Sequence, residues 1–438
     1  MISNRFFILF SCFLLLSTQI VFITQSLDEP VSIIYVDDDN IEGPWDGSEE
    51  HPFQHINDAL ESAQKEVSIK VCEGLYHEQL VIEKEVTLEG ETSEKTIITH
   101  NSSKNLLVIK NTENVTLSNF TITQNNADTK TVGIQIRNSS AIIISQTIIE
   151  QHEYGISITN KSKNCIIYDN TIRENHIGFS LFSTHHNLFY ANNVENNAIP
   201  FILQNTQRNV IKENTILNQK QKPFFTDSYD TIDHNYWGKT VPIFLFPGFQ
   251  TIPFLDISIR WIKADWHTAS DIAELQKNPL AQMKTTKGTM IFELFEQQMP
   301  LTCENFIELS TIDFFKGLVF HRVIDDFVIQ GGGYDINGTY KESPFGPINL
   351  ETHPDINHVD GAISMARTND PNSATSQFFV CDGPQESLDG KYASFGVILV
   401  GFDVLRDIAA VETTTKHGFM KDWPVNDIII TEITIENQ

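Results

Sequence analysis

A repeat of about 22 residues in the middle of the chain limits the possible folds more than any other feature of this sequence. A unit close to x-x-Asn-Thr-Ile recurs with spacings of 27, 24, 22, 22 and 21 residues, at Asn119, Gln146, Asn170, Asn192, Asn214 and Asn235. A second unit, close to Gly-Ile-x-Ile, recurs with spacings of 22, 23 and 22 residues, at Gly133, Gly155, Gly178 and Pro200. Repetition at this period is typical of a solenoid, in which each repeat packs on its neighbours.

The repeats are built from strands rather than helices. Runs of three to six residues rich in Ile, Val and Phe alternate with turns rich in Asn, Ser and Thr, without helical periodicity. We therefore expect a right-handed parallel β-helix over residues 31–240, in which stacked coils share one core. Asn at the repeated corner tolerates the left-handed backbone conformation and can hydrogen-bond to Asn of the next coil. The Leu-x-x-Leu-x-Leu pattern of a leucine-rich repeat, the main alternative, is missing.

The start of this region carries a further signal. Residues 35–62 read YVDDDNIEGPWDGSEEHPFQHINDALES, and the pattern V-x-x-G-x-Y-x-E-x-x-x-I begins at Val71. This arrangement resembles the opening of pectin-lyase-like and NosD-type β-helix proteins. The resemblance implies an extended strand followed by an amphipathic helix over residues 56–63, which covers the open end of the β-helix.

Two features of the β-helix region could carry chemistry. The run Asp37-Asp38-Asp39 could bind calcium or act in polysaccharide cleavage, but a solvated loop before the capping helix is the favoured interpretation. The pair His185-His186 could be metal ligands, but adjacent residues of a strand point to opposite faces, so we expect no shared metal. Because paired carboxylates do not recur, we expect a binding or spacer module for extended carbohydrate or protein.

Residues 241–280 lose the repeat. Their first part, rich in Phe, Pro and Ile, is expected to pack on the last coil as a cap. The stretch from Arg260 onward is expected to link the β-helix to a further domain.

Four sequence blocks in the last third of the chain are more specific. The first, MKTTKGTMIFELFEQQMPLTCENFIELS, predicts two turn-linked strands and then a helix that starts after Pro300. The others are GLVFHRVIDDFVIQGGG, GAISMARTNDPNSATSQFFV and SLDGKYASFGVILVG. Their order and spacing over residues 281–438 resemble cyclophilin-type peptidyl-prolyl cis-trans isomerases. The resemblance implies a closed eight-stranded antiparallel β-barrel with a helix at each end.

The reaction that this resemblance implies makes or breaks no covalent bond. The barrier to rotation about an X-Pro bond, ~18–20 kcal/mol, comes from amide resonance, so the enzyme must favour the twisted state. An apolar pocket for the proline ring and a donor aimed at the imide nitrogen favour that state, and the Arg322 guanidinium offers the donor. By family correspondence, Arg322 and Gln330 are the expected catalytic residues, without cofactor or metal. The expected substrate-binding residues are His321, Phe327, Val328, Ala366, Arg367, Gln377, Phe379, Leu388 and Tyr392.

Structural alternatives exist for several of these residues. Arg322 could form a surface ion pair with Asp325 or Asp326, and Phe327 and Phe379 could belong to the barrel core. The run MARTNDPNSATSQFF is similar to prokaryotic members of the family. Three residues depart from the best-known eukaryotic members, in which Trp, Asn and His take the places of Ser387, Arg367 and Tyr392.

Residues 1–26 have the pattern of a leader. Arg5 precedes an 18-residue, mainly apolar run from Phe6 to Ile23, which fits a secretory signal peptide or an N-terminal membrane anchor. We therefore expect export to an extracytoplasmic or cell-surface location, secreted or membrane-anchored. If the leader is not cleaved, we expect it to be the part of the chain that contacts a membrane.

Charge and cysteine content narrow the function further. The chain has 30 Lys and Arg against 57 Asp and Glu, a net charge of −27 without a basic cluster, which argues against nucleic-acid binding. Five cysteines without a CxxC pair exclude a disulfide scaffold and a Cys-rich zinc site. Cys72, Cys165, Cys303 and Cys381 are interpreted as buried thiols, although a disulfide among them stays open.

These observations favour an exported isomerase that acts on X-Pro bonds of protein substrates and assists protein folding. The main alternative is a non-catalytic surface protein that binds Pro-containing peptides or carbohydrate. Arg322 argues against it, since a pseudo-enzyme is expected to lack this residue. A third hypothesis makes the β-helix a carbohydrate-active enzyme with an isomerase attached.

Overall fold

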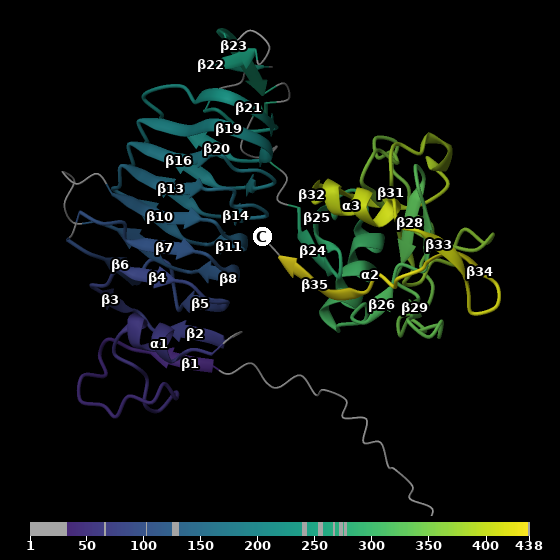
Figure 1. Cartoon of the computed structure of the whole chain (residues 1–438), viewed down its shortest axis with the longest axis horizontal. Helices are drawn as coiled ribbons and strands as arrows, with labels where there is room; N and C mark the ends of the chain where they lie inside the picture. Colours follow the sequence, from purple (N-terminus) through teal and green to yellow (C-terminus); the bar gives the residue numbers. More distant parts are fainter. Residues whose placement is uncertain are drawn as a thin grey trace, which may run out of the picture.

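Two mainly β bodies lie side by side in the computed structural model of this chain (Figure 1). It describes residues 33–436 except 65–66, 102, 125–130, 239–242, 253–256, 266–267, 271–274 and 276–277. The expected leader therefore lies outside the described residues. Within the described part of the chain, no helix is long and apolar enough to cross a membrane.

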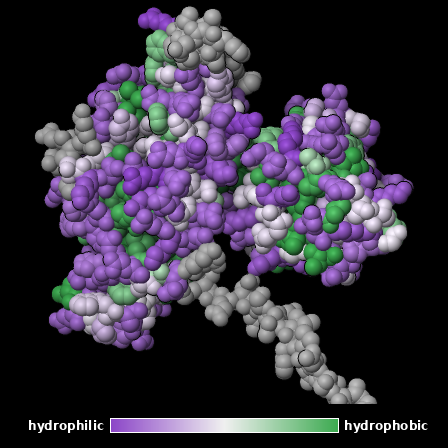
Figure 2. Space-filling view, viewed as in Figure 1, coloured by the Kyte–Doolittle hydropathy of each residue, from purple (hydrophilic) through white to green (hydrophobic). Residues whose placement is uncertain are grey.

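Each sequence repeat forms one coil of a β-helix, and equivalent strands of successive coils pair in parallel. Ile134 pairs with Ile156, Ile156 with Phe179, and Phe179 with Phe201, all of them buried. Because side chains alternate along a strand, every second residue points into one shared core. The outward residues give the visible face of the coils a mostly hydrophilic surface (Figure 2). The predicted parallel β-helix is confirmed.

The strands of the coils form three faces. The first consists of β4 (Leu80–Ile82), β7 (Leu107–Lys110), β10 (Val132–Arg137), β13 (Tyr154–Thr159), β16 (Ile177–Phe182) and β19 (Ile199–Lys212). The second consists of β1 (Ile33–Val36), β2 (Val67–Val71), β5 (Val86–Gly90), β8 (Glu113–Ser118), β11 (Ser140–Ser145), β14 (Ile166–Tyr168) and β17 (Leu188–Tyr190). The third consists of β3 (Gly74–Tyr76), β6 (Thr96–Thr99), β9 (Thr121–Thr123), β12 (Ile148–Glu150), β15 (Thr171–Arg173), β18 (Asn193–Glu195) and β20 (Thr215–Leu217). The long strand β19 pairs with both β16 and β17 and so joins the first two faces.

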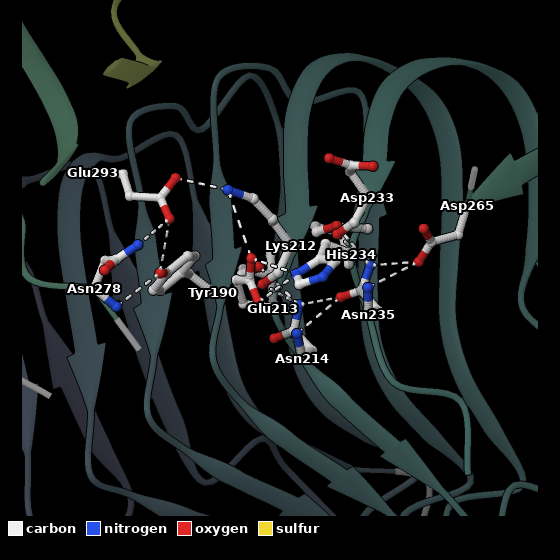
Figure 3. Close-up of polar contacts among 12 residues, drawn as sticks. Tyr190, Lys212, Glu213, Asn214, Asp233, His234, Asn235, Asp265, Asn278 and Glu293 are labelled. Carbon is white, nitrogen blue, oxygen red and sulfur yellow. Dashed lines mark hydrogen bonds and ion pairs between the residues drawn. The ribbon is translucent and has the colours of Figure 1, made fainter. Parts of the chain in front are cut away.

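Buried asparagines form a hydrogen-bonded ladder along one corner of the coils (Figure 3). Asn192 donates its backbone and side-chain N–H groups to Asn214 Oδ1, each at 2.9 Å, and Asn214 does the same to Asn235. The ladder ends on Asp265, whose Oδ2 accepts from Asn235 and from the Trp237 indole. The expected ladder is confirmed.

The expected reason for Asn at this corner is only partly right. Asn119 and Gln146 have the left-handed backbone conformation. In the later coils the left-handed residue precedes the ladder asparagine, at Asp169, Ala191, Glu213 and His234. There, Asn serves to satisfy buried backbone groups, because its side chain both donates and accepts.

Separate elements cover the two ends of the β-helix. Helix α1 (Ile56–Ser62) buries Ile56, Ala59 and Leu60 at the first coil, as predicted, and the Glu78 carboxylate accepts hydrogen bonds from its first N–H groups. At the other end, β21 (Phe224–Asp233) extends the sheet beyond β19, and an antiparallel hairpin of β22 (Phe244–Ile252) and β23 (Ile257–Asp265) follows. The hairpin lies where the sequence predicts a cap.

The C-terminal body is a curled antiparallel sheet with the strand order β27-β28-β31-β30-β32-β25-β24-β35. Helices α2 (Pro300–Thr311) and α3 (Phe402–Ala409) pack on it. The eight sheet strands are β24 (Leu280–Thr285), β25 (Gly288–Leu294), β27 (Arg322–Ile324), β28 (Val328–Gly331), β30 (Ala362–Met365), β31 (Phe378–Cys381), β32 (Ser394–Val400) and β35 (Ile430–Glu436). Outside the sheet lie β26 (Leu318–Val319), β29 (Tyr334–Asp335), the 3₁₀ helix η2 (Glu386–Leu388), β33 (Thr413–Lys416) and β34 (Met420–Pro424).

The expected closed barrel is not confirmed. In the described part of the chain, the end strands β27 and β35 do not pair with each other. Isolated backbone hydrogen bonds bridge the gap, from Phe320 N–H to the Ile428 carbonyl at 3.0 Å and from Gly317 N–H to the Ile430 carbonyl at 2.9 Å. The residues before β27 form β26, which pairs with β29 and makes one isolated bridge, between Val319 and Ile429, to the segment before β35.

A buried interface joins the two bodies. One apolar cluster contains Ile143, Ile166, Tyr168, Leu188, Tyr190 and Ala191 of the coils and Leu280, Ile291 and Val400 of the C-terminal sheet. Beside this cluster, Glu293 accepts hydrogen bonds from Lys212 Nζ at 2.7 Å, from Asn278 Nδ2 at 3.0 Å and from Tyr190 Oη at 3.3 Å (Figure 3). Because Glu293 is 2% exposed, its carboxylate needs these partners to offset the cost of burial.

Candidate functional site

The antiparallel pair β27–β28 positions the expected catalytic residues. Arg322 begins β27 and lies opposite Gln330 of β28. A turn with a left-handed residue at Asp326 connects the two strands. Arg322 Nη1 donates to Gln330 Oε1 at 3.4 Å, and Gln330 Nε2 donates to Gln377 Oε1 at 3.0 Å. The guanidinium therefore lies at the end of a chain of oriented amides.

Apolar side chains from three strands form a pocket next to this guanidinium. Val328 of β28, Ala362 of β30, and Phe379 and Cys381 of β31 pack as one buried cluster. The pocket has a volume of about 200 Å³, which suits one small ring rather than an extended apolar ligand. Its lining residues are Arg322, Phe327, Val328, Gln330, Ala366, Arg367, Phe379, Leu388 and Tyr392. The structure thus brings together nine of the eleven residues that the family correspondence predicts.

The far wall of the pocket combines an aromatic ring with a fixed cation. Tyr392 meets Phe379 edge to face, with ring centroids 5.7 Å apart. The Arg367 guanidinium lies 4.5 Å from the centre of the Tyr392 ring. Arg367 also donates from Nε and Nη2 to the Lys391 carbonyl, at 3.1 and 2.8 Å, and from Nη1 to the Thr368 carbonyl at 2.8 Å. These contacts hold the cation and the ring in one orientation.

The electrostatic partner of Arg322 is not the one that its sequence neighbours suggest. Its Nε lies 4.0 Å from Asp422 Oδ2 on β34, and its guanidinium carbon lies 5.9 Å from the centre of the Phe327 ring. The Arg322 side chain is 38% exposed, so it faces the open side of the pocket and can reach a bound ligand. Sequence reasoning missed Asp422, because 100 residues separate it from Arg322 and no motif contains it.

Two predicted residues lie beside the pocket rather than on it. His321 is 7% exposed and its ring contacts Tyr334 at 4.8 Å between centroids. Since neighbours on an extended segment point to opposite sides, His321 and Arg322 cannot both face the ligand. Burial lowers the pKa of His321 to about 4, so the ring is neutral near pH 7. Gln377 contacts the site through Gln330.

Two other candidates lie in the β-helix. In the run Asp37-Asp38-Asp39, Asp37 accepts a hydrogen bond from the Asp39 N–H and Asp38 accepts one from the Leu75 N–H, each at 3.0 Å. These contacts support the interpretation of the run as a loop before the cap. His185 and His186 do not point to opposite faces as expected: His186 has a φ of 55°, and the two Nδ1 atoms lie 3.2 Å apart. The strand rule fails there because the pair lies at a turn.

One acidic group lies close to the pocket. Carboxylate oxygens of Asp325, Asp326 and Asp382 lie within 4.8 Å of one another. Asp382 already accepts hydrogen bonds from Arg406 and from the Asp326 backbone N–H. The group is therefore explained by contacts within the protein.

The four cysteines of the described part are free thiols, and three are buried. Burial raises the pKa of Cys165 and of Cys381 to about 12, so neither is a thiolate at neutral pH. The interpretation as buried thiols is confirmed for Cys165, Cys303 and Cys381, whereas Cys72 is partly exposed.

Comparison with known proteins matches a family to each body. The family described as cyclophilin type peptidyl-prolyl cis-trans isomerase matches residues 280–435, and the right handed beta helix region matches residues 105–236. A peptidyl-prolyl cis-trans isomerase of Acinetobacter baylyi is 36% identical over 165 residues, which are 36% of this chain and 87% of that protein. Peptidyl-prolyl cis-trans isomerase B of Escherichia coli is 34% identical over 159 residues, which are 34% of this chain and 96% of that protein. A crystal structure of a Cryptosporidium parvum cyclophilin type isomerase in the presence of the dipeptide Ala-Pro is 33% identical, with a TM-score of 0.33 over 36% of this chain and 99% of that one.

Proposed function

Because this chain belongs to the cyclophilin-type peptidyl-prolyl cis-trans isomerases, we propose that its pocket beside Arg322 isomerises X-Pro bonds of protein substrates outside the cytoplasm. The observation that carries the assignment of this site is the juxtaposition of one accessible guanidinium with a small apolar pocket. The pocket holds the proline ring, and Arg322 faces the imide bond at its rim.

The mechanism follows from what rotation does to the imide nitrogen. When the bond twists, resonance is lost and the nitrogen regains a lone pair, which accepts a hydrogen bond from Arg322. The planar imide offers no such acceptor, so the interaction favours the twisted state alone and lowers the barrier. Gln330 fixes the guanidinium, and Gln377 fixes Gln330. A hydrogen bond to a charged donor contributes about 1.5–3 kcal/mol, or roughly 10- to 150-fold in rate.

The test is a proline-peptide isomerisation assay on the full chain. We expect Arg322→Ala to lower kcat and kcat/KM together by about 10- to 100-fold, because the lost contact exists in the twisted state. Arg137→Ala removes a cation from β10 of the β-helix and serves as the matched control. Equal rates for the wild type and Arg322→Ala would exclude the proposed role.

We further propose that the β-helix is a rigid carrier, which holds the C-terminal body with its pocket facing away from the coils. Strands β24 and β35 end the C-terminal sheet next to the coils, whereas the pocket strands β27 and β28 lie at its other end (Figure 1). The buried Glu293 supports a fixed rather than a flexible connection. Export rests on the leader pattern of residues 1–26, and deletion of this leader should retain the protein inside the cell.

A polar groove favours a ligand-binding role for the carrier as well. It has a volume of about 620 Å³ along one corner of the coils. Its lining includes Glu113, Asn111, Asn138, Lys161 and Lys163, whose donors and acceptors suit an extended, hydroxyl-rich ligand such as carbohydrate. Affinity electrophoresis of the full chain in polysaccharide gels tests this role, and Lys163→Ala should weaken any retardation.

A further inference from the structure

A buried histidine lies directly behind the proline pocket and stacks on one of its lining residues. The His358 side chain is 1% exposed, and its ring stacks on Phe379 at 5.9 Å between centroids with an angle of 14°. Its Nδ1 lies 2.9 Å from Asp389 Oδ1, and its Nε2 lies 3.0 Å from Ser364 Oγ. Since a carboxylate can only accept, Nδ1 carries the proton and Nε2 accepts from the Ser364 hydroxyl.

Both partners of His358 belong to elements that build the pocket. Ser364 of β30 lies opposite Phe379 of β31 in the antiparallel ladder. Asp389 directly follows η2, which carries the lining residue Leu388. The imidazole therefore connects the strand that holds one wall to the turn that holds another.

The backbone of His358 holds the same turn. Its N–H donates to Asp389 Oδ1 at 2.7 Å, and its carbonyl accepts from the Gln385 N–H at 2.7 Å. The Leu388 N–H in turn donates to the Gln385 carbonyl at 3.0 Å. In the turn at 385–389, Glu386 and Ser387 are exposed, so the position of the turn depends on these contacts and on the Gln385 side chain, which donates to the Asp326 carbonyl at 3.1 Å.

We propose that His358 is a positioning residue, which holds Phe379 and Leu388 at the spacing that the proline ring requires. The role rests on the proposed isomerase function and goes beyond it, since His358 does not line the pocket. Burial lowers the pKa of His358, so the ring stays neutral near pH 7 and keeps this pattern of one donor and one acceptor. A leucine at this position fills similar space but holds neither Asp389 nor Ser364.

The experiment compares full-length variants in the proline-peptide assay. If Phe379 and Leu388 are less firmly held, the pocket binds the substrate proline ring less tightly in both the planar and the twisted state. KM should therefore rise while kcat stays the same. We expect His358→Leu to raise KM by about tenfold, the equivalent of one charge-assisted hydrogen bond, with kcat within about twofold. His358→Gln can reach one partner at a time and should raise KM by a smaller factor. His152→Leu is the matched control, because His152 is equally buried but lies in the β-helix.

A merely structural role gives a different result. Loss of stability lowers the amount of active protein and hence the apparent kcat, whereas it leaves KM unchanged. An unchanged KM in folded His358→Leu overturns the proposal. If that variant does not fold, Asp389→Ala decides, because it breaks the same contact from the partly exposed side, and an unchanged KM there also overturns it. If turnover does not depend on Arg322, the proposed isomerase site itself is wrong. This result distinguishes a failure of the proposed function from a failure of the proposed role of His358.

Discussion

The ion pair between Lys212 and Glu293 offers the sharpest test of how the two bodies are joined. Their charged atoms lie 2.7 Å apart, with side chains 20% and 2% exposed. Lys212→Met keeps the apolar stem but leaves the Glu293 carboxylate buried without a cation. Removing one partner of a buried pair typically costs 3–5 kcal/mol. We expect about 3 kcal/mol here, because Tyr190 and Asn278 still donate to Glu293.

A second pair in the same chain provides the control. Lys284 and Glu432 also lie 2.7 Å apart, but their side chains are 34% and 43% exposed. Solvent screens such a pair, so Lys284→Met should cost at most about 1 kcal/mol. Distance is equal in the two pairs, and burial is the variable under test.

Urea unfolding of the full chain, followed by circular dichroism, measures both costs. Because the buried pair joins the two bodies, Lys212→Met should also separate their unfolding into two transitions. Combination with Glu293→Gln in a double-mutant cycle should give a coupling energy above about 1 kcal/mol. The reasoning is refuted if Lys212→Met costs no more than Lys284→Met.

Three further predictions concern the core and the pocket. Burial lowers the pKa of His152 from 6.5 to about 4, so the unfolded chain binds the proton first as the pH falls. The wild type should therefore lose about 3 kcal/mol more stability than His152→Gln between pH 6.5 and 4 in urea unfolding, and parallel curves would contradict this. Asn214→Ala breaks the buried ladder and should lower the free energy of unfolding by about 3 kcal/mol, since several donors and acceptors lose their partners. A loss below about 1 kcal/mol would show that the ladder contributes little to stability. Arg367→Ala removes the cation on Tyr392 and should raise KM by about two- to fivefold in the peptide assay, whereas an unchanged KM would mean that the cation does not shape the pocket.

Much of the architecture follows from local sequence. The 22-residue period dictates parallel stacking, because equivalent residues of successive coils must share one core. The capping helix at Ile56 and the strands around Arg322 follow from patterns that span a few residues each. All nine pocket residues lie within the short blocks that carry the family resemblance, so the sequence could name them, although packing of separate strands brings them around one cavity.

Contacts between distant elements were decided by the tertiary structure alone. In the later coils, the residue with the left-handed backbone conformation directly precedes the ladder asparagine. The inward hydrogen bonds and the left-handed conformation therefore belong to neighbouring residues. His321 is buried beside the pocket rather than lining it, and the sheet is open between β27 and β35. No spacing in the sequence could pair Lys212 with Glu293 or His358 with Asp389, since such pairs exist only once separate strands and turns have packed together.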